Sequence, residues 1–291
     1  MANRNERPAR RGQGCPRPLR GGGPRGAQPK RGGRAAAGRP SGTFIEGRRA
    51  AAEALRAGFP VKRALVCAAP GDVAKPSALL RDLAAAGIPV EEVSRERLDA
   101  ISSHGAHQGI VLEAGAFPYV ELADIVRASG SDPALVVVLD HVTDEGNLGA
   151  IVRSAEVVGA AGVVIASDRA AGVGVGTFKT SAGAVMHLPI ARAVNLARAI
   201  DELKEAGFWV GGASEHAEDI CWRAPMEGRL ALVMGSEGEG LSRLVREKCD
   251  FLVKLPQRGA TESLNVAQAA TVLCYEWMRR SWDALEGGVS A

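Results

Sequence analysis

The sequence lacks the hallmarks of a secreted, membrane-spanning or metal-binding protein. Its five cysteines lie far apart and form no C-x-x-C pair, which favours a reducing compartment over a disulfide-stabilised secreted fold. They are Cys15, Cys67, Cys221, Cys249 and Cys274. No apolar run approaches the roughly 20 residues of a membrane helix, so we expect a soluble, cytoplasmic protein that does not contact membranes. We expect no metal site either, because His104 and His107 have no nearby third ligand.

Acidic residues are almost missing from the first 40 positions. This segment holds eleven Arg or Lys residues and one acid, Glu6, whereas the rest of the chain holds 25 basic and 32 acidic residues. It is rich in Gly and Pro and too poor in apolar residues to bury a core, so residues 1–42 are predicted to be a disordered basic tail. Counterion release favours RNA as its partner. A solubilising tail and a transit peptide are the alternatives, although Gly and Pro would interrupt the helix of a transit peptide.

After the tail, short apolar runs alternate with helical segments. The first group predicts strands at 64–67, 90–93 and 109–113 and helices at 48–57 and 77–86. It forms a small α/β domain over residues 43–115. Residues 116–133, which contain Pro118 and Gly130, read as a linker with one short helix.

The alternation resumes in a second domain, predicted over residues 134–284 and followed by a short tail at 285–291. Strands are predicted at 135–139, 163–166, 209–212 and 230–234, and helices from Leu148 and from Ser263, the latter as N-cap. The continuous apolar run 135–139 is typical of a strand covered on both faces. In the helix from Leu148 one apolar stripe forms, and Arg153 falls off it. The fold class is therefore α/β with a mostly parallel sheet.

Three separated turns carry polar groups beside glycine or an apolar element. They are Asp144–Ala155, Val233–Leu241, and Leu255-Pro256 leading to Ser263–Ala267. In the second turn, glycines follow a buried strand and precede a helix, which offers backbone N–H groups to a ligand; an ordinary strand-to-helix turn is the alternative. The run Gly172–Gly176 lacks the spacing of a dinucleotide fingerprint and is predicted to be a flexible loop. A Ser-His-Asp hydrolase has no support, because no nucleophile elbow is present.

In order and spacing, these turns resemble the three motifs of the SpoU, or TrmH, family of RNA ribose 2′-O-methyltransferases in the SPOUT superfamily. The resemblance covers residues 135–280, and the small domain, ending in His107-Gln108-Gly109-Ile110, resembles the substrate-binding domain of the RlmB type. It implies a trefoil knot near the C-terminus, S-adenosylmethionine as cofactor, a homodimer, and a guanosine of 23S-type rRNA as substrate. A tRNA substrate, or a non-catalytic RNA-binding or ribosome-assembly protein with the same fold, are the alternatives.

The resemblance also implies site residues. The positions that match the catalytic set are Asn147, Arg153, Glu237, Ser263 and Asn265. Those that match the cofactor-binding set are Gly235, Glu237, Gly240, Leu255, Pro256 and Leu264. Because a guanidinium is effectively always protonated, Arg153 is expected to hold a phosphate or a developing alkoxide rather than act as a base; a surface ion pair with Glu156 is the alternative. The sequence departs from the family pattern at Glu145, Arg258 and Glu262.

Overall fold

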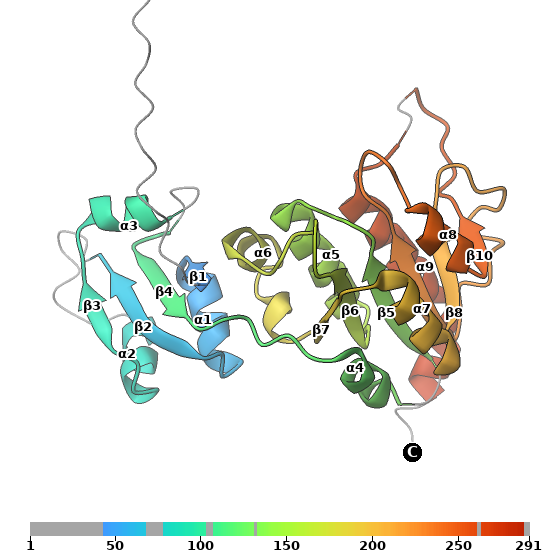
Figure 1. Cartoon of the computed structure of the whole chain (residues 1–291). Coiled ribbons are helices and arrows are strands. Elements are labelled where there is room, and N and C mark those ends of the chain that lie inside the picture. Colours follow the sequence, from blue (N-terminus) through green and yellow to red (C-terminus); the bar gives the residue numbers. More distant parts are fainter. Residues whose placement is uncertain (1–42, 68–77, 103–106, 131–132, 261–262, 288–291) are drawn as a thin grey trace, which may run out of the picture. The chain divides into compact units, whose positions relative to one another are not determined.

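The computed structural model describes residues 43–67, 78–102, 107–130, 133–260 and 263–287 (Figure 1). The predicted basic tail, His104 and Glu262 lie outside these ranges. None of the helices in the described ranges is long and apolar enough to cross a membrane.

The N-terminal part forms a four-stranded sheet in the order β1-β4-β2-β3. Its strands are β1 Thr43–Glu46, β2 Val61–Val66, β3 Val90–Glu92 and β4 Ile110–Ala114, and its helices are α1 Arg48–Arg56, α2 Ala78–Ala85 and α3 Arg95–Ile101. Strand β4 pairs antiparallel with β1 and β2, and β2 pairs parallel with β3. The three predicted strands and two predicted helices are confirmed. Strand β1 and helix α3 were not predicted, because β1 has only four residues and α3 buries only Leu98.

The C-terminal part contains a six-stranded sheet in the order β10-β8-β9-β5-β6-β7. Its strands are β5 Ala134–Leu139, β6 Gly162–Ala166, β7 Ile190–Ala193, β8 Trp209–Ala213, β9 Arg229–Met234 and β10 Phe251–Val253. The helices are α4 Leu122–Ala128, α5 Glu145–Val157, α6 Val175–Thr180, the 3₁₀ helix η2 Ala184–Met186, α7 Leu196–Glu205, α8 Arg243–Lys248 and α9 Val266–Gly287. Every pairing in this sheet is parallel, which confirms the predicted parallel α/β class.

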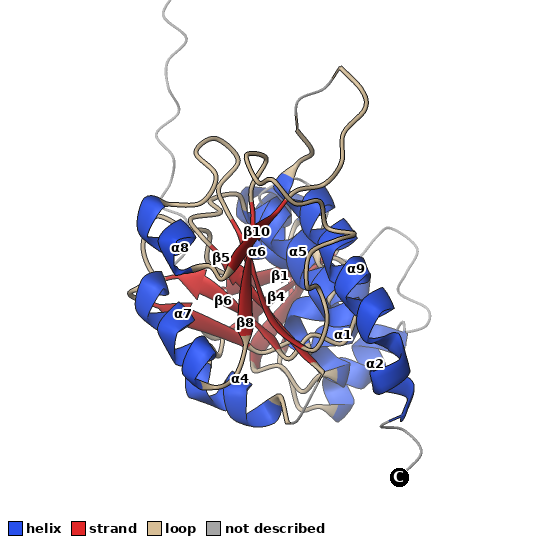
Figure 2. Ribbon diagram, turned by 90° about the vertical axis from the view of Figure 1, so that its right-hand side faces the viewer, coloured by secondary structure: helices blue, strands red, loops and turns tan. Residues whose placement is uncertain are grey.

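Helices cover both faces of the parallel sheet (Figure 2). Successive strand side chains point to opposite faces, and β5 shows this directly. Leu135, Val137 and Leu139 pack in the cluster that contains buried residues of α5 and α9. Val136 and Val138 pack in a second cluster with residues of α4, α7 and α8. A strand buried on both faces explains why residues 135–139 form an uninterrupted apolar run.

The predicted starts of two helices differ from the observed ones. Helix α5 begins at Glu145 instead of Leu148, because Asp144 Oδ1 accepts the N–H of Asn147 at 2.8 Å and caps the helix. The prediction of Ser263 as the N-cap of the last helix is wrong. Asn265 has that role, since its Oδ1 accepts the N–H of Ala267 at 2.9 Å.

The run Gly172–Gly176 is a loop up to Gly174, as predicted, and its last two residues begin α6. Glu145 Oε2 accepts the N–H of Gly176 at 2.8 Å. A Cβ atom at Gly174 would lie 2.6 Å from Glu145 Oε1. The glycines therefore make room for the side chain of Glu145, which gives this departure from the family pattern a structural reason.

Candidate active site

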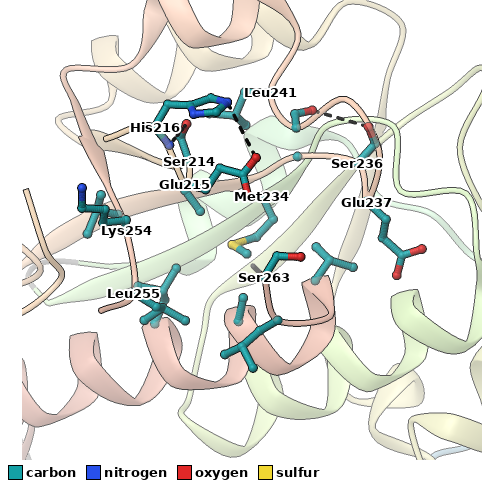
Figure 3. Close-up of a pocket in the computed structure, with 18 of the residues that line it drawn as sticks. Ser214, Glu215, His216, Met234, Ser236, Glu237, Leu241, Lys254, Leu255 and Ser263 are labelled. Atoms are coloured by element: carbon teal, nitrogen blue, oxygen red, sulfur yellow. Dashed lines mark hydrogen bonds and ion pairs between the residues drawn. The ribbon is translucent and has the colours of Figure 1, made fainter. Parts of the chain in front are cut away.

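A cavity of about 760 Å³ opens where three strands of the parallel sheet end (Figure 3). Segments that follow β8, β9 and β10 line it, together with the residues before α9. Ligands of parallel α/β sheets characteristically bind at the carboxyl ends of the strands, and the volume suits a small organic molecule. All six residues predicted to bind a cofactor line this cavity: Gly235, Glu237, Gly240, Leu255, Pro256 and Leu264.

The glycine loop at the end of β9 closes on itself. Ser236 and Gly240 exchange two backbone hydrogen bonds of 3.1 and 3.0 Å. A Cβ atom at Gly235 would lie 2.2 Å from the carbonyl carbon of Gly240, and Gly240 has a φ of +67°. Both positions therefore require glycine. The resulting tight turn presents main chain, without side chains in between, to a ligand in the cavity.

Asp140 ties the far end of this loop to the central strand of the sheet. The residue follows β5 and is 1% exposed. Its Oδ2 accepts the N–H of Ser242 at 2.6 Å, and its Oδ1 lies 2.6 Å from His141 Nδ1. The sequence reading missed Asp140, although an acid directly after a buried strand was a usable signal.

The loop after β8 adds polar groups that the sequence reading also missed. Ser214, Glu215 and His216 line the cavity, and His216 Nε2 lies 3.6 Å from Glu215 Oε1. Arg246 of α8 and Lys254 after β10 supply positive charge to the same lining. The loop after β8 and Lys254 after β10 could have been found from the parallel-sheet rule, but β10 itself was not predicted. The described residues contain no group of three or more His, Cys, Asp or Glu side chains that could hold a metal ion.

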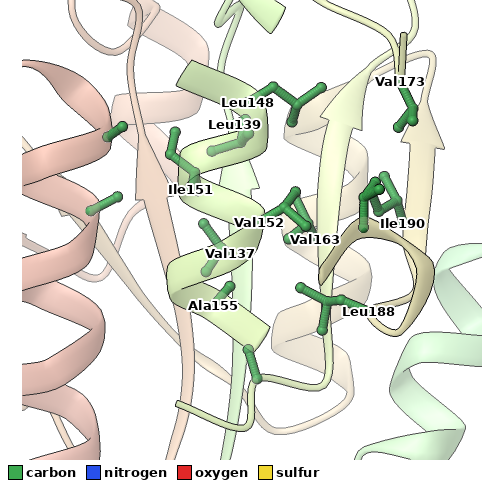
Figure 4. Close-up of a cluster of buried hydrophobic side chains, with 14 of the residues drawn as sticks. Val137, Leu139, Leu148, Ile151, Val152, Ala155, Val163, Val173, Leu188 and Ile190 are labelled. Carbon is green, nitrogen blue, oxygen red and sulfur yellow. The ribbon is translucent and has the colours of Figure 1, made fainter. Parts of the chain in front are cut away.

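Helix α5 turns its apolar stripe to the sheet (Figure 4). The predicted stripe is confirmed, because its members are all buried: Leu148, Ile151, Val152, Ala155 and Val158. Arg153 is exposed and makes no hydrogen bond or ion pair with any residue in the described ranges. The alternative of an ion pair with Glu156 is therefore wrong for this chain. Arg153 does not line the cavity of its own chain.

Three other predicted residues meet in one hydrogen-bonded network at the edge of the cavity. Asn147 comes from α5, Glu237 from the glycine loop and Asn265 from the start of α9. Asn147 Nδ2 and Asn265 Nδ2 both donate to Glu237 Oε1, the second at 3.0 Å, and Asn265 Nδ2 also donates to Asn147 Oδ1 at 3.0 Å. Ser263 lines the cavity beside them, in the segment that precedes α9 (Figure 3).

Comparison with known proteins finds RNA methyltransferases that resemble both parts of the chain. Residues 134–275 match the SpoU rRNA Methylase family, and residues 44–120 match the domain described as RNA 2′-O ribose methyltransferase substrate binding. The chain is 41% identical over 201 residues to a 23S rRNA (guanosine-2′-O-)-methyltransferase, RlmB, of Ralstonia nicotianae, covering 69% of this chain and 81% of that protein. It is 40% identical over 243 residues to an uncharacterized tRNA/rRNA methyltransferase of Mycolicibacterium vanbaalenii, covering 83% of this chain and 77% of that protein.

A solved structure has the same fold. The SpoU methyltransferase AviRb from Streptomyces viridochromogenes, crystallised with the cofactor AdoMet, aligns with a TM-score of 0.70 and 26% sequence identity. The alignment covers 81% of this chain and 89% of that one.

Proposed function

Because the chain belongs to the SpoU family of S-adenosylmethionine-dependent RNA 2′-O-methyltransferases, we propose that it methylates the ribose of a guanosine in 23S-type rRNA. The proposal depends on one observation: predicted cofactor-binding residues and predicted catalytic residues meet at one site. The six cofactor positions line one cavity, and Asn147, Glu237 and Asn265 form a network at its edge. The guanosine assignment rests on the similarity to the Ralstonia nicotianae enzyme.

The cavity fits S-adenosylmethionine in size and chemistry. Met234, Leu255 and Leu264 provide apolar surface for the adenine, and the Gly235–Gly240 loop provides main-chain donors and acceptors. When bound, the cofactor supplies a methyl group on a sulfonium, which is an activated leaving group. The protein can therefore achieve much of the acceleration by holding the ribose oxygen in line with that methyl group.

The polar residues orient the ribose and stabilise charge. The amides of Asn147 and Asn265, fixed by the network, orient the ribose, and Ser263 contributes a hydroxyl beside them. Arg153, which has no partner among the described residues, is available to hold a phosphate or the negative charge that develops on the ribose oxygen.

We also propose that the protein is a homodimer that associates through α5 and α9. These helices pack side by side, and Ser154 Oγ lies 2.7 Å from Thr271 Oγ1. Their outer faces expose large apolar side chains, which is unusual for a surface without a partner. These are Val157, Val272, Tyr275 and Trp282, with exposed fractions of 57%, 46%, 44% and 47%. Arg153 lies one helical turn before Val157, so this association would bury it near a second copy.

Other parts of the proposal rest on the family resemblance. They are the trefoil knot, a cytoplasmic location, and the division into a substrate-binding domain at 43–115 and a methyltransferase domain at 134–284. A tRNA substrate is the second candidate, because the Mycolicibacterium vanbaalenii relative is described as a tRNA/rRNA methyltransferase.

The test is methyl transfer from labelled S-adenosylmethionine to unmodified 23S rRNA and to unmodified tRNA, followed by mapping of the modified nucleotide. We expect label on a ribose 2′-oxygen of a guanosine in rRNA. Label in tRNA alone would show that tRNA, and not rRNA, is the substrate. Label in a base would refute ribose methylation.

A further inference from the structure

We propose that Oε2 of Glu237 is the atom that accepts the ribose 2′-hydroxyl proton. This assignment rests on the proposed ribose methylation, and the experiment below separates the two.

The cap of α9 fixes the orientation of the Asn265 side chain. Its Oδ1 accepts the backbone N–H groups of Ala267 and Gln268, at 2.9 and 3.4 Å, as the cap of α9. Only the oxygen of an amide side chain can accept an N–H. The nitrogen must therefore face the other way, toward Asn147 and Glu237, and the assignment of oxygen and nitrogen follows from the network.

Asn265 in turn fixes the orientation of the Asn147 amide. Its Oδ1 accepts one N–H of Asn265 at 3.0 Å, so its own Nδ2 is turned toward Glu237. The position of Asn147 is set separately by the helix cap, since its backbone N–H donates to Asp144 at 2.8 Å. Both amides thus lie at helix starts and take part in their capping hydrogen bonds.

One oxygen of the Glu237 carboxylate, Oε1, accepts an N–H group from each of the two amides. This arrangement suits an ionised carboxylate, which is an acceptor only. The other oxygen, Oε2, has no hydrogen bond or ion pair with the residues that the structure describes. The network therefore holds Oε1 in place and leaves Oε2 without a hydrogen bond to the described residues, beside the cavity.

The other candidate groups are less suitable. An amide or a serine hydroxyl does not take up a proton near neutral pH, and the guanidinium of Arg153 already carries its proton. His216 and Glu215 lie on the far side of the cavity from Glu237 (Figure 3), and their side chains are 81% and 58% exposed. Of these groups, only Glu237 combines basicity with fixed geometry.

The step is balanced without a further reactant. The 2′-oxygen forms a bond to the methyl carbon, the carbon–sulfur bond breaks with its electron pair going to sulfur, and the 2′-proton passes to Oε2. The products are the methylated ribose, S-adenosylhomocysteine and a protonated Glu237, which then returns its proton to water. General bases of this kind typically contribute about 10²- to 10⁴-fold to a rate.

The deciding variant is Glu237→Gln, which keeps an oxygen for the two amides but removes the basic atom. Methyl transfer would be measured in a single turnover at saturating cofactor and RNA, cofactor affinity by titration calorimetry, and RNA affinity by fluorescence anisotropy. We expect the rate to fall at least about 100-fold, while both dissociation constants and the melting temperature stay within about threefold and 2 °C of wild type. The matched control is Glu218→Gln, at an exposed carboxylate after β8 that does not line the cavity.

The outcomes are distinct. Wild-type ribose methylation together with a Gln variant that stays within threefold of its rate would overturn the assignment of the proton acceptor and leave the proposed function standing. A rate loss that Glu218→Gln shares equally would also overturn it, because the effect would then come from the loss of a negative charge anywhere on this side of the protein. Wild-type protein that methylates no ribose would remove the proposed function itself.

Discussion

The carboxylate of Asp140 accepts the backbone N–H of Ser242 at 2.6 Å, across 102 positions of sequence. Through this bond the exit of the glycine loop is held against the central strand β5, while Ser236 and Gly240 close the loop itself. A buried acceptor therefore sets the shape of a loop that it does not belong to.

Replacement of Asp140 by Ala should weaken cofactor binding more than it weakens the fold. A hydrogen bond to a charged group is worth about 1.5–3 kcal/mol, so we expect the dissociation constant for S-adenosylmethionine to rise at least about tenfold. Asp140→Asn, which keeps an acceptor oxygen, should recover part of the affinity. Asp168→Ala, at an exposed acid after the neighbouring strand β6, is the control. Unchanged calorimetric affinity in Asp140→Ala would show that the loop holds its shape without this bond.

A methyl group at Gly174 should clash with Glu145. We expect Gly174→Ala to lower the free energy of unfolding by about 1–3 kcal/mol, as overpacking does, and to cost less in a Glu145→Ala background. Denaturant unfolding of the four proteins in this double-mutant cycle is the measurement. Gly238→Ala, where an added Cβ would meet nothing within 4 Å, should be nearly neutral. Additive effects at positions 145 and 174 would contradict the observed contact.

Loss of the Arg153 guanidinium should affect turnover and spare cofactor binding. Removal of a group that stabilises developing charge typically lowers a rate about 10²- to 10³-fold, and Arg153 does not line the cofactor cavity. Single-turnover rates and calorimetry of Arg153→Ala would measure the two effects. Arg198→Ala, at an exposed arginine of α7 paired with Glu202, is the control. Near-normal turnover in Arg153→Ala would exclude Arg153 from the reaction.

A charge placed on the outer face of α9 should dissociate the proposed dimer. Val272→Asp and Tyr275→Asp introduce a carboxylate into a surface that would be desolvated on association, at a high energetic cost. Light scattering after size-exclusion chromatography should show a monomer for both variants and a dimer for wild type. Val194→Asp, at a side chain 89% exposed outside α5 and α9, should leave the dimer intact. Dimeric Val272→Asp and Tyr275→Asp proteins would place the interface elsewhere.

Two cysteines should be unreactive in the native protein. Burial raises the pKa of both the Cys249 and Cys274 thiols to about 12, and only the thiolate is strongly nucleophilic. Iodoacetamide at pH 8 should therefore leave both unmodified until guanidinium unfolds the protein, as peptide mass spectrometry would show. Because the folded pKa values lie above the unfolded value of 9.0, their contribution to stability is fully present below pH 9 and is lost as the pH rises toward 12. Rapid alkylation of native Cys274 would contradict its burial.

The sequence by itself determined much of the fold, because apolar periodicity is a local property. The run 135–139 and the stripe of α5 each predicted both the element and the face that it buries. Short elements with few buried residues escaped, as β1, α3 and β10 show. In β1 and β10, pairing with distant strands, and not local preference, decides the conformation.

For the site, the sequence supplied the residue types, and the tertiary structure decided how they meet. The three motifs pointed to Asn147, Glu237 and Asn265, yet nothing local reveals that two amides 118 positions apart share one carboxylate oxygen. The same holds for Glu145, whose departure from the family pattern is explained only by Gly174 and by Gly176, which lies 31 positions later. Hydrogen bonds between segments far apart in the chain depend on how the parallel strands align their carboxyl ends, and that alignment exists only once the sheet has formed.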